Sequence, residues 1–256
     1  LDLYQQGIVN VEDIPEDMKL SEQQQFAVVS AKHANEGELE IDKLAVQSFL
    51  DSLTYPLYHF DFETFQQPIP EFKGVSSYQQ IPFQYSLHIE HSDGSLVHEE
   101  FLGVEGDDPR HALVEKLIND IPLNVTTLAF NASFEQMVFK GLAKQFPQHK
   151  EHLLNISNNI VDLATPFQKK QYYLPEMKGK YSIKIVLPLL VPEMEKAYKD
   201  LDLIHNGSEA MQAFAVLGDM KDRGLVEKYR DSLLAYCKLD TLAMVKVLDK
   251  LRNDSE

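Results

Sequence analysis

Hydrophobic and polar residues alternate in two runs between residues 82 and 103, which is the pattern of β-strands, and an apolar run precedes them at residues 57–62. We predict a first strand over residues 57–62 and two more strands in the segments PFQYSLHIE and SLVHEEFLG. The linking segment HSDGS contains Asp93-Gly94, a dipeptide typical of tight hairpin turns. The sequence therefore predicts an antiparallel hairpin directly after the first strand.

Helical and strand-like patterns alternate from residue 107 onward. The segments GDDPRHALVEKLIND and SFEQMVFKGLAKQF have helical apolar spacing, and the apolar segment NVTTLAFN between them is typical of a buried strand. There follow a short strand in NNIVDL, a helix ended by prolines in SIKIVLPLLV, a helix in SEAMQAFAVLGDM and a last helix over about 227–251. This order predicts an α/β domain with a mixed β-sheet flanked by helices.

Residues 1–54 differ from the rest in pattern and charge. They have helical spacing, and Tyr55-Pro56 ends that pattern just before the first strand. Residues 1–57 carry eleven acids against three lysines, a net charge of −8. The first residue is Leu, which is expected of a fragment or a processed chain. We therefore divide the chain into a short helical, acidic lead-in, residues 1–54, and a sheet domain, residues 55–256.

Composition narrows the class of protein. The chain has 256 residues, 44% hydrophobic and 25% charged, which is typical of a globular protein with a sizeable core. The single cysteine, Cys237, excludes a disulfide within the chain and favours a reducing, cytoplasmic location. The longest apolar run, residues 185–191, is too short to span a bilayer, so we expect no membrane association. Neither a G-x-G-x-x-G motif nor a P-loop is present, which leaves nucleotide binding of those kinds unsupported.

The net charge of −16 has the wrong sign for a protein that binds nucleic acid over a broad face. One segment is different, because residues 168–184 hold five lysines and one glutamate, a local charge of +4, with three tyrosines among them. Lysines interleaved with aromatic residues suit a single strand, whose phosphates attract cations and whose bases stack. A solvated loop is the alternative. The lysines in question are Lys169, Lys170, Lys178, Lys180 and Lys184.

Asp61 and Glu63 lie two residues apart near the end of the first predicted strand, so both side chains point to one face. Two carboxylates together at a buried strand end repel each other, and a divalent cation with a preference for oxygen ligands, Mg²⁺ or Mn²⁺, removes that cost. The alternative is a pair of solvated acids in a loop.

Two further segments place acids at defined points of predicted helices. Tyr236 and Asp240 are four residues apart and share one helix face. The alternative is a tyrosine packed at the edge of the core and an acid on the solvated side of the helix. Glu135 follows Asn131 where a strand gives way to a helix, and a negative charge in a first helical turn is also favoured by the helix dipole.

Taken in order, D-x-E, N-x-x-x-E and Y-x-x-x-D resemble the motifs of the DEDD (DnaQ-like) superfamily of 3′–5′ exonucleases, which have the RNase H-like fold. The match covers roughly residues 55–256 and favours the tyrosine subtype, because position 235, where the histidine subtype has His, is Ala235. The sequence departs from the superfamily at Glu135, where Asp is usual. Asp162 is a rival for that role, for which we favour a structural interpretation.

The resemblance implies a two-metal hydrolysis of phosphodiester bonds in DNA or RNA. Asp61, Glu63 and Asp240 would hold one Mg²⁺ or Mn²⁺ ion, Asp61 and Glu135 would hold a second, and Tyr236 would orient the attacking water. The residues expected to contact a nucleic acid with a free, single-stranded 3′ end are Asn131, Thr64, Phe65 and the five lysines of residues 168–184.

The segments IPFQYSLHIE, SIKIVLPLLVPEM, HNGSEA and LLAYCKLDTLAM are also similar to an uncharacterised bacterial domain-of-unknown-function family assigned to the RNase H-like exonucleases. In that family the domain often follows a RecB-like or Cas4-like nuclease domain. This resemblance implies that residues 1–54 are the tail of an upstream segment of the same polypeptide.

Two other functions agree with the same residues. One is a catalytically silent RNase H-like module that binds nucleic acid or a partner domain within a larger nuclease, which the acidic surface and Glu135 favour. The other is an endonuclease or small-nucleotide phosphodiesterase that uses the same acids. We expect stepwise release from the 3′ end to distinguish an exonuclease from both.

Overall fold

The protein is described by a computed structural model that places residues 2–15, 17–33 and 40–256. Its strands are β1 (Glu40–Ile41), β2 (Leu57–Phe65), β3 (Ile81–Glu90), β4 (Leu96–Leu102), β5 (Thr126–Ala129), β6 (Ile160–Asp162) and β7 (Tyr172–Tyr173). Its α-helices are α1 (Asp2–Gln5), α2 (Glu22–His33), α3 (Lys43–Asp51), α4 (Arg110–Asp120), α5 (Ser133–Gln145), α6 (Lys150–Asn158), α7 (Thr165–Gln168), α8 (Ile183–Leu190), α9 (Pro192–Lys199), α10 (Gly207–Leu217) and α11 (Arg223–Ser255). Short 3₁₀ turns are η1 (Val11–Asp13), η3 (Pro147–His149) and η4 (Pro175–Met177).

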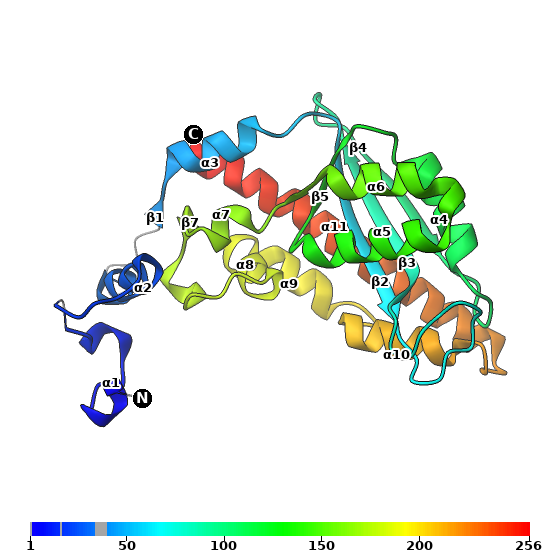
Figure 1. The fold of residues 1–256 in the computed structure, drawn as a ribbon, viewed down its shortest axis with the longest axis horizontal. Coiled ribbons are helices and arrows are strands. Elements are labelled where there is room, and N and C mark those ends of the chain that lie inside the picture. The colour runs from blue at the N-terminus through cyan, green and yellow to red at the C-terminus, as the bar shows by residue number, and fades with distance from the viewer. Residues whose placement is uncertain (1, 16, 34–39) are drawn as a thin grey trace.

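The main sheet has five strands in the order β4-β3-β2-β5-β6. β2, β3 and β4 are antiparallel neighbours, whereas β5 runs parallel to β2 and β6 runs parallel to β5. Figure 1 shows α4, α5 and α6 on one face of this sheet and the long helix α11 crossing the other. The expected α/β fold, with a mixed sheet flanked by helices and a helical N-terminal extension, is confirmed.

One face of the sheet is apolar. Tyr58, Phe60 and Phe62 alternate along β2 and pack with residues of α4, α5 and α6 in one buried cluster. The ring of Phe139 on α5 lies with its centroid 5.3 Å from that of Phe60 and 5.0 Å from that of Phe62. This burial of aromatic surface, which the sequence pattern predicts, fixes β2 and α5 against each other.

The opposite face, under α11, carries polar side chains. The Gln84 amide donates to the Leu233 carbonyl oxygen over 2.8 Å, and the Ser86 and Thr241 hydroxyls are 2.7 Å apart. Thr241 also lies 2.7 Å from Nδ1 of His88, farther along β3. Buried polar groups require partners, so these contacts fix where α11 lies along β2 and β3. The acids on β2 share this polar face.

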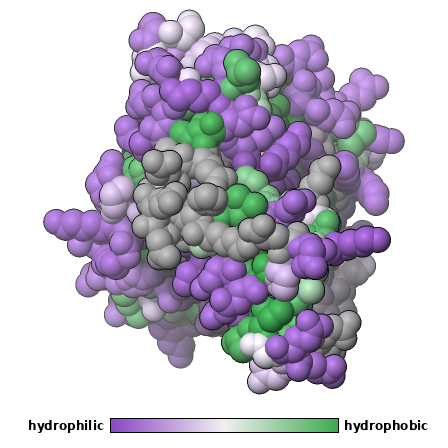
Figure 2. Space-filling view, turned by 90° about the vertical axis from the view of Figure 1, so that its left-hand side faces the viewer, coloured by the Kyte–Doolittle hydropathy of each residue, from purple (hydrophilic) through white to green (hydrophobic). Residues whose placement is uncertain are grey.

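The N-terminal extension leads into the sheet domain through β1, which pairs with β7, and through α3. Val46 of α3 is fully buried in the same cluster as Leu248 of α11, and Figure 1 shows α3 beside the C-terminal end of α11. The domain boundary at residue 54 stays a prediction. Figure 2 views this end of the molecule, where hydrophilic residues cover most of the visible surface and hydrophobic ones form small patches.

The predicted elements agree closely with the observed ones. The hairpin turn has Gly94 at φ +83°, a conformation that favours glycine, and the His91 N–H donates to the Ser95 carbonyl oxygen over 2.9 Å. The last helix is longer than predicted, because Asp222 caps it with hydrogen bonds from the N–H groups of Gly224 and Leu225. Across the described ranges, none of the helices has the length and apolar character needed to cross a bilayer.

Candidate metal centre

The acids of β2 lie beyond the end of its parallel partner. β5 pairs with β2 only from Leu57 to His59, so Asp61 and Glu63 border the space where β5 has already ended. The chain leaves β5 through Asn131, at φ +67°, and enters α5, which carries Glu135 in its first turn. Openings at the carboxyl ends of parallel strands are common places for ligands in α/β sheets.

Three carboxylates from two distant parts of the sequence meet in this space. Asp61, Glu63 and Asp240 each offer an oxygen atom, and these atoms lie within 4.8 Å of one another. Asp240 comes from the middle of α11, where the polar face of the sheet meets that helix. The structure thus brings together the three residues that the resemblance assigns to a first metal ion.

Glu135 lines the same cavity without belonging to that close group. Its side chain is 4% exposed, and among the described residues its Oε2 atom has no hydrogen-bond partner. Its charge nevertheless contributes to the raised pKa values of Asp61 and Glu63. A buried carboxylate oxygen without a partner is costly, and a cation would relieve that cost. Its place in a second metal site stays a prediction.

Two tyrosines hold Asp240. The Tyr198 hydroxyl of α9 donates to Asp240 Oδ1 over 2.6 Å, and Tyr236, one turn before Asp240 on α11, is a second hydrogen-bond donor. Burial raises the pKa of each tyrosine, and the charge of Asp240 raises it further. Both hydroxyls therefore stay protonated near neutral pH and donate rather than accept.

The electrostatics of the cluster are those of carboxylates with too little positive charge nearby. Burial, followed by the charges of the other acids, raises the pKa of Glu63 to about 8 and that of Asp61 well above its ordinary value. Burial also raises the pKa of Glu135 to about 7. The pKa of Asp240 rises only to about 6, because its two tyrosine donors and Lys184 oppose the effect of burial.

These residues fit a divalent cation. Carboxylate oxygens are the ligands that Mg²⁺ and Mn²⁺ prefer, and the orphaned oxygen of Glu135 adds an acceptor that no described protein group satisfies. Lys184 is the lysine that lines the cavity, and a single ammonium cannot neutralise four acids. A doubly charged cation would favour the ionised forms of these carboxylic acids and would lower their raised pKa values toward ordinary ones.

The cavity around the acids has a volume of about 560 Å³. Its lining combines the carboxylates and Tyr236 with the apolar side chains of Phe130, Phe134, Ile183, Leu187, Pro188 and Met244. A lining of both acidic and apolar side chains suits a ligand with one charged or metal-bound part and one flat apolar part.

Three residues predicted to contact nucleic acid lie outside this lining. Thr64 donates its hydroxyl to Gln80 Oε1 over 2.7 Å. Phe65 shares the face of Glu63, but α10 covers it, and its ring packs on Phe83 and Phe214 with 3% exposed. Asn131 is exposed, and its backbone N–H donates to Asp162 Oδ1 over 2.9 Å. In this structure Phe65 is a core residue.

The predicted lysine segment does not act as one surface. Lys184, at the start of α8, lines the cavity, whereas Lys169, Lys178 and Lys180 are exposed and are absent from its lining. Lys170 lies with its ammonium 4.7 Å from the centre of the Phe26 ring, a cation–π contact with α2. Binding of a strand by this segment stays a prediction.

Asp162 has the structural role that we favoured. Its Oδ1 accepts hydrogen bonds from the N–H groups of Asn131 and Ala164, each over 2.9 Å, and so ties the end of β5 to the end of β6. Tyr198 was not predicted as a site residue, because it lies outside every quoted motif. Gly207 was not predicted either, although it lies in the quoted segment HNGSEA; a Cβ there would come within 3.4 Å of Glu63 Oε2.

Comparisons with known proteins agree with the expected similarity to a family of unknown function. A curated relative, the uncharacterized protein UU173 of Ureaplasma parvum serovar 3, is 27% identical over 237 residues, or 82% of this chain and 33% of its own length. The chain thus spans about a third of that relative. No solved structure matches significantly. Residues 58–182, which include Asp61, Glu63 and Glu135, match the family described as a domain of unknown function, DUF2779.

Proposed function

We propose that this chain is a metal-dependent 3′–5′ exonuclease that hydrolyses phosphodiester bonds of DNA or RNA. The observation that carries the proposal is the meeting of Asp61, Glu63 and Asp240 within 4.8 Å, with Glu135 in the same cavity. The mixed sheet with helices on both faces agrees with the RNase H-like fold that the sequence resemblance implies. Two Mg²⁺ or Mn²⁺ ions are the proposed cofactors.

Each residue of the cluster has a separate role in the proposed reaction. Asp61, Glu63 and Asp240 would hold one ion, and Asp61 with Glu135 would hold the other. Bound divalent ions would supply Lewis acidity toward the phosphate and the attacking water. The Tyr236 hydroxyl, which remains protonated, would orient the water by hydrogen bonding rather than take its proton. Tyr198 would keep the Asp240 carboxylate in position.

The cavity favours a strand end over the middle of a duplex. Its volume of about 560 Å³ is enough for one nucleotide, and the apolar side chains of its lining offer a surface for the terminal base. Phe130 and Phe134 are among these apolar side chains. We infer a single-stranded 3′ end as the substrate, because a paired base could not enter a pocket of this kind without leaving its stack.

The polypeptide that contains this chain is proposed to carry a further nuclease domain. The family resemblance implies an upstream RecB-like or Cas4-like domain, and the curated relative is about three times the length of the matched part. Activity on long substrates would then involve both domains.

Degradation of 5′-labelled single-stranded DNA and RNA in Mn²⁺ or Mg²⁺ tests the proposal, with Asp240→Asn as the matched control. We expect a ladder that shortens from the 3′ end and a loss of at least about 1,000-fold in the variant, because one ligand of the metal is neutralised. Internal cuts would instead indicate an endonuclease. Absence of both cleavage and Mn²⁺ binding would overturn the proposal and favour the catalytically silent module.

A further inference from the structure

A second hollow lies beside the candidate metal centre, between α5 and the loop that precedes β3. Its volume is about 680 Å³. We call it the α5 groove; its lining residues from the loop and β3 are Tyr78, Gln79, Gln80 and Pro82, and those from α5 are Ser133, Met137, Val138, Lys140, Gly141, Leu142, Lys144 and Gln145.

The charge of the α5 groove is opposite to that of the chain. The described residues that line it include two lysines and no carboxylate, although the protein has a net charge of −16. Lys140 and Lys144 lie four residues apart on α5, so their side chains share one face of the helix. Both are exposed, and neither takes part in a described ion pair. The groove is therefore locally suited to an anionic ligand.

Three glutamines add hydrogen-bond donors to this lining. The Gln79 Oε1 atom accepts from the Ser76 N–H over 3.0 Å, and the Gln145 Oε1 atom accepts from Arg110 Nη1 over 2.7 Å. Ser76 N–H and the guanidinium can only donate, so the orientation of these two amides is fixed by their partners. Gln80 Oε1 accepts from the Thr64 hydroxyl. In each case the amide NH₂ group is the part left to donate to a ligand.

An aromatic ring stands at the loop side of the groove. Tyr78 is 66% exposed and has φ +58°, a left-handed conformation that a tyrosine rarely adopts. The Tyr78 N–H donates to the Gln67 carbonyl oxygen over 2.9 Å, which holds this conformation. Met137, across the groove on α5, is 49% exposed. Nucleobases stack on exposed aromatic rings of this kind in positively charged grooves.

The groove and the acidic cavity adjoin at the start of α5. Ser133 lines the groove, whereas the next two residues, Phe134 and Glu135, line the cavity. On the other side, Gln80 of the groove is bonded to Thr64, the neighbour of Glu63. A strand whose last nucleotide occupied the cavity would have its preceding nucleotides within reach of the groove.

We propose that the α5 groove binds single-stranded nucleic acid upstream of the 3′ end. Lys140, Lys144 and the glutamine amides contact phosphate oxygens, and a base stacks on Tyr78. This inference rests on the proposed exonuclease function for the direction in which the strand runs. The α5 groove, rather than the segment of residues 168–184, is then the main binding surface for the strand.

Binding in the absence of divalent ions separates the groove from the catalytic proposal. Fluorescence anisotropy would follow labelled oligonucleotides of about 12 deoxythymidines or uridines in EDTA, since single-strand sites cover roughly 4–16 nucleotides. For Lys140→Gln/Lys144→Gln we expect at least about tenfold weaker binding at low salt. The slope of log K against log salt should fall by about 1.4, because each single-strand phosphate contact contributes about 0.7.

The rival surface supplies the matched control. Lys178→Gln/Lys180→Gln removes the same charge from the segment predicted by sequence, and we expect its affinity to change by less than about threefold. The groove inference is overturned if this variant loses affinity and the α5 variant does not. It is also overturned if the wild-type chain binds neither oligonucleotide.

Three substitutions at two positions test the groove without disturbing the fold. A Cβ at Gly141 meets nothing within 4 Å, so Gly141→Gln and Gly141→Glu differ only in charge, and the glutamate should bind more weakly by at least about fivefold. Glycine adopts the backbone of Tyr78 without strain, so Tyr78→Gly removes the aromatic side chain and should cost roughly five- to 150-fold in affinity. Equal affinities for the two Gly141 variants, or an unchanged Tyr78→Gly, would contradict the inference.

Binding that depends on the α5 groove, together with the absence of both hydrolysis and Mn²⁺ binding, would support the groove and refute the exonuclease. Hydrolysis by the wild type and by Lys140→Gln/Lys144→Gln at equal kcat/KM on the oligonucleotide would refute the groove and keep the exonuclease.

Discussion

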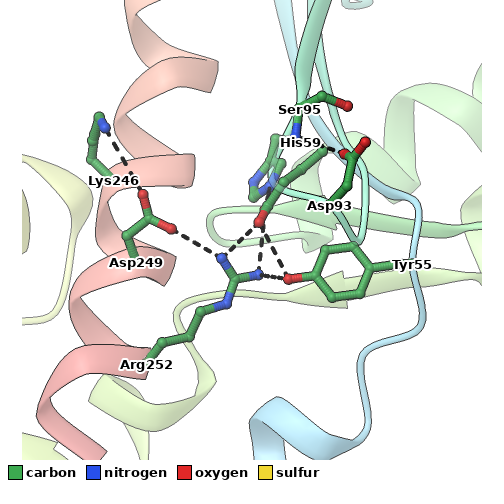
Figure 3. Close-up of polar contacts among 8 residues, drawn as sticks. Tyr55, His59, Asp93, Ser95, Lys246, Asp249 and Arg252 are labelled. Atoms are coloured by element: carbon green, nitrogen blue, oxygen red, sulfur yellow. Dashed lines mark hydrogen bonds and ion pairs between the residues drawn. The ribbon is translucent and has the colours of Figure 1, made fainter.

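The same two elements, β2 and α11, carry two buried polar clusters that differ in charge balance. In one, the acid Glu90 meets Arg252 at 2.7 Å and His59 at 3.1 Å, and Arg252 also contacts the Tyr55 hydroxyl and Asp249 (Figure 3). In the other, three turns earlier on α11, acids meet other acids. In the first cluster Arg252 balances the charge of Glu90, whereas in the second Lys184 is the cation that offsets the charges of the acids.

The pKa values of the two clusters move in opposite directions. Burial alone would raise the pKa of Glu90, but hydrogen bonds from His59 and Arg252 lower it to about 2. The pKa of Glu63 instead rises to about 8. Both acids are less than a tenth exposed, so burial does not explain the difference. The nearby charge does, because Glu90 faces Arg252 whereas Glu63 faces other acids.

Removal of the cation from the complete cluster should have the largest effect on stability. Arg252→Met leaves the carboxylate of Glu90 buried with His59 and Tyr55, and we expect a loss of about 4 kcal/mol in the free energy of unfolding. Urea denaturation measures it. Arg252→Lys keeps the charge and should lose less than half as much. A loss below about 1 kcal/mol for Arg252→Met would show that the charge balance described for this cluster is not important for stability.

The acidic cluster should make the metal-free protein less stable as pH rises. Its folded pKa values, about 6 for Asp240, about 7 for Glu135 and about 8 for Glu63, lie above the unfolded values, so the folded state binds protons more tightly. For this contribution, stability is then greatest below about pH 4 and is lost as pH rises through the folded pKa values.

Thermal denaturation in EDTA between pH 5 and 8 would detect that fall, and saturating Mn²⁺ should remove it because bound metal favours the ionised acids. Glu90 has the opposite sign, since its contribution is present above about pH 4.5 and is lost as pH falls toward 2. A metal-free stability that rises steadily from pH 5 to 8 would contradict the assignment of the raised pKa values.

The same isosteric change should have opposite signs in the two clusters. Asp61→Asn removes a repelled charge and should stabilise the metal-free protein by about 2 kcal/mol at pH 8. Glu90→Gln removes a paired charge and should destabilise it by about 2 kcal/mol. Chemical denaturation in EDTA compares them directly. Changes of the same sign would mean that the two clusters do not differ in the way described.

The smallest expected effect on stability concerns Tyr198, one of the two tyrosines beside Asp240. Tyr198→Phe removes one donor, should cost about 1 kcal/mol of stability, and should raise the pKa of Asp240 further. In activity assays Tyr198→Phe would shift the acidic limb of the pH–rate profile to higher pH, with kcat at its plateau reduced less than about tenfold.

Tyr236→Phe should instead lower the plateau of kcat, by about 100-fold or more, because Tyr236 is proposed to orient the water. Identical profiles for the two variants would contradict separate roles.

Much of the fold and part of the candidate site could be predicted because they depend on local spacing. Alternation placed Asp61 and Glu63 on one face of a strand, and helical period placed Tyr236 and Asp240 on one face of a helix. The hairpin and the mixed sheet followed from the order of the elements and from the Asp93-Gly94 turn. The exonuclease interpretation itself came from the resemblance of the motifs, and it stays a proposal.

The sequence by itself determined which residues share a face, because a strand repeats every two residues and a helix every 3.6. Only the tertiary structure decided what each face meets. It brought Tyr198 of α9 onto Asp240, covered Phe65 with α10, and separated four of the five predicted lysines from the cavity. It also turned Lys140 and Lys144 into the lining of a groove. Such contacts join residues far apart in the chain, and their geometry follows from how whole elements pack, which local periodicity does not encode.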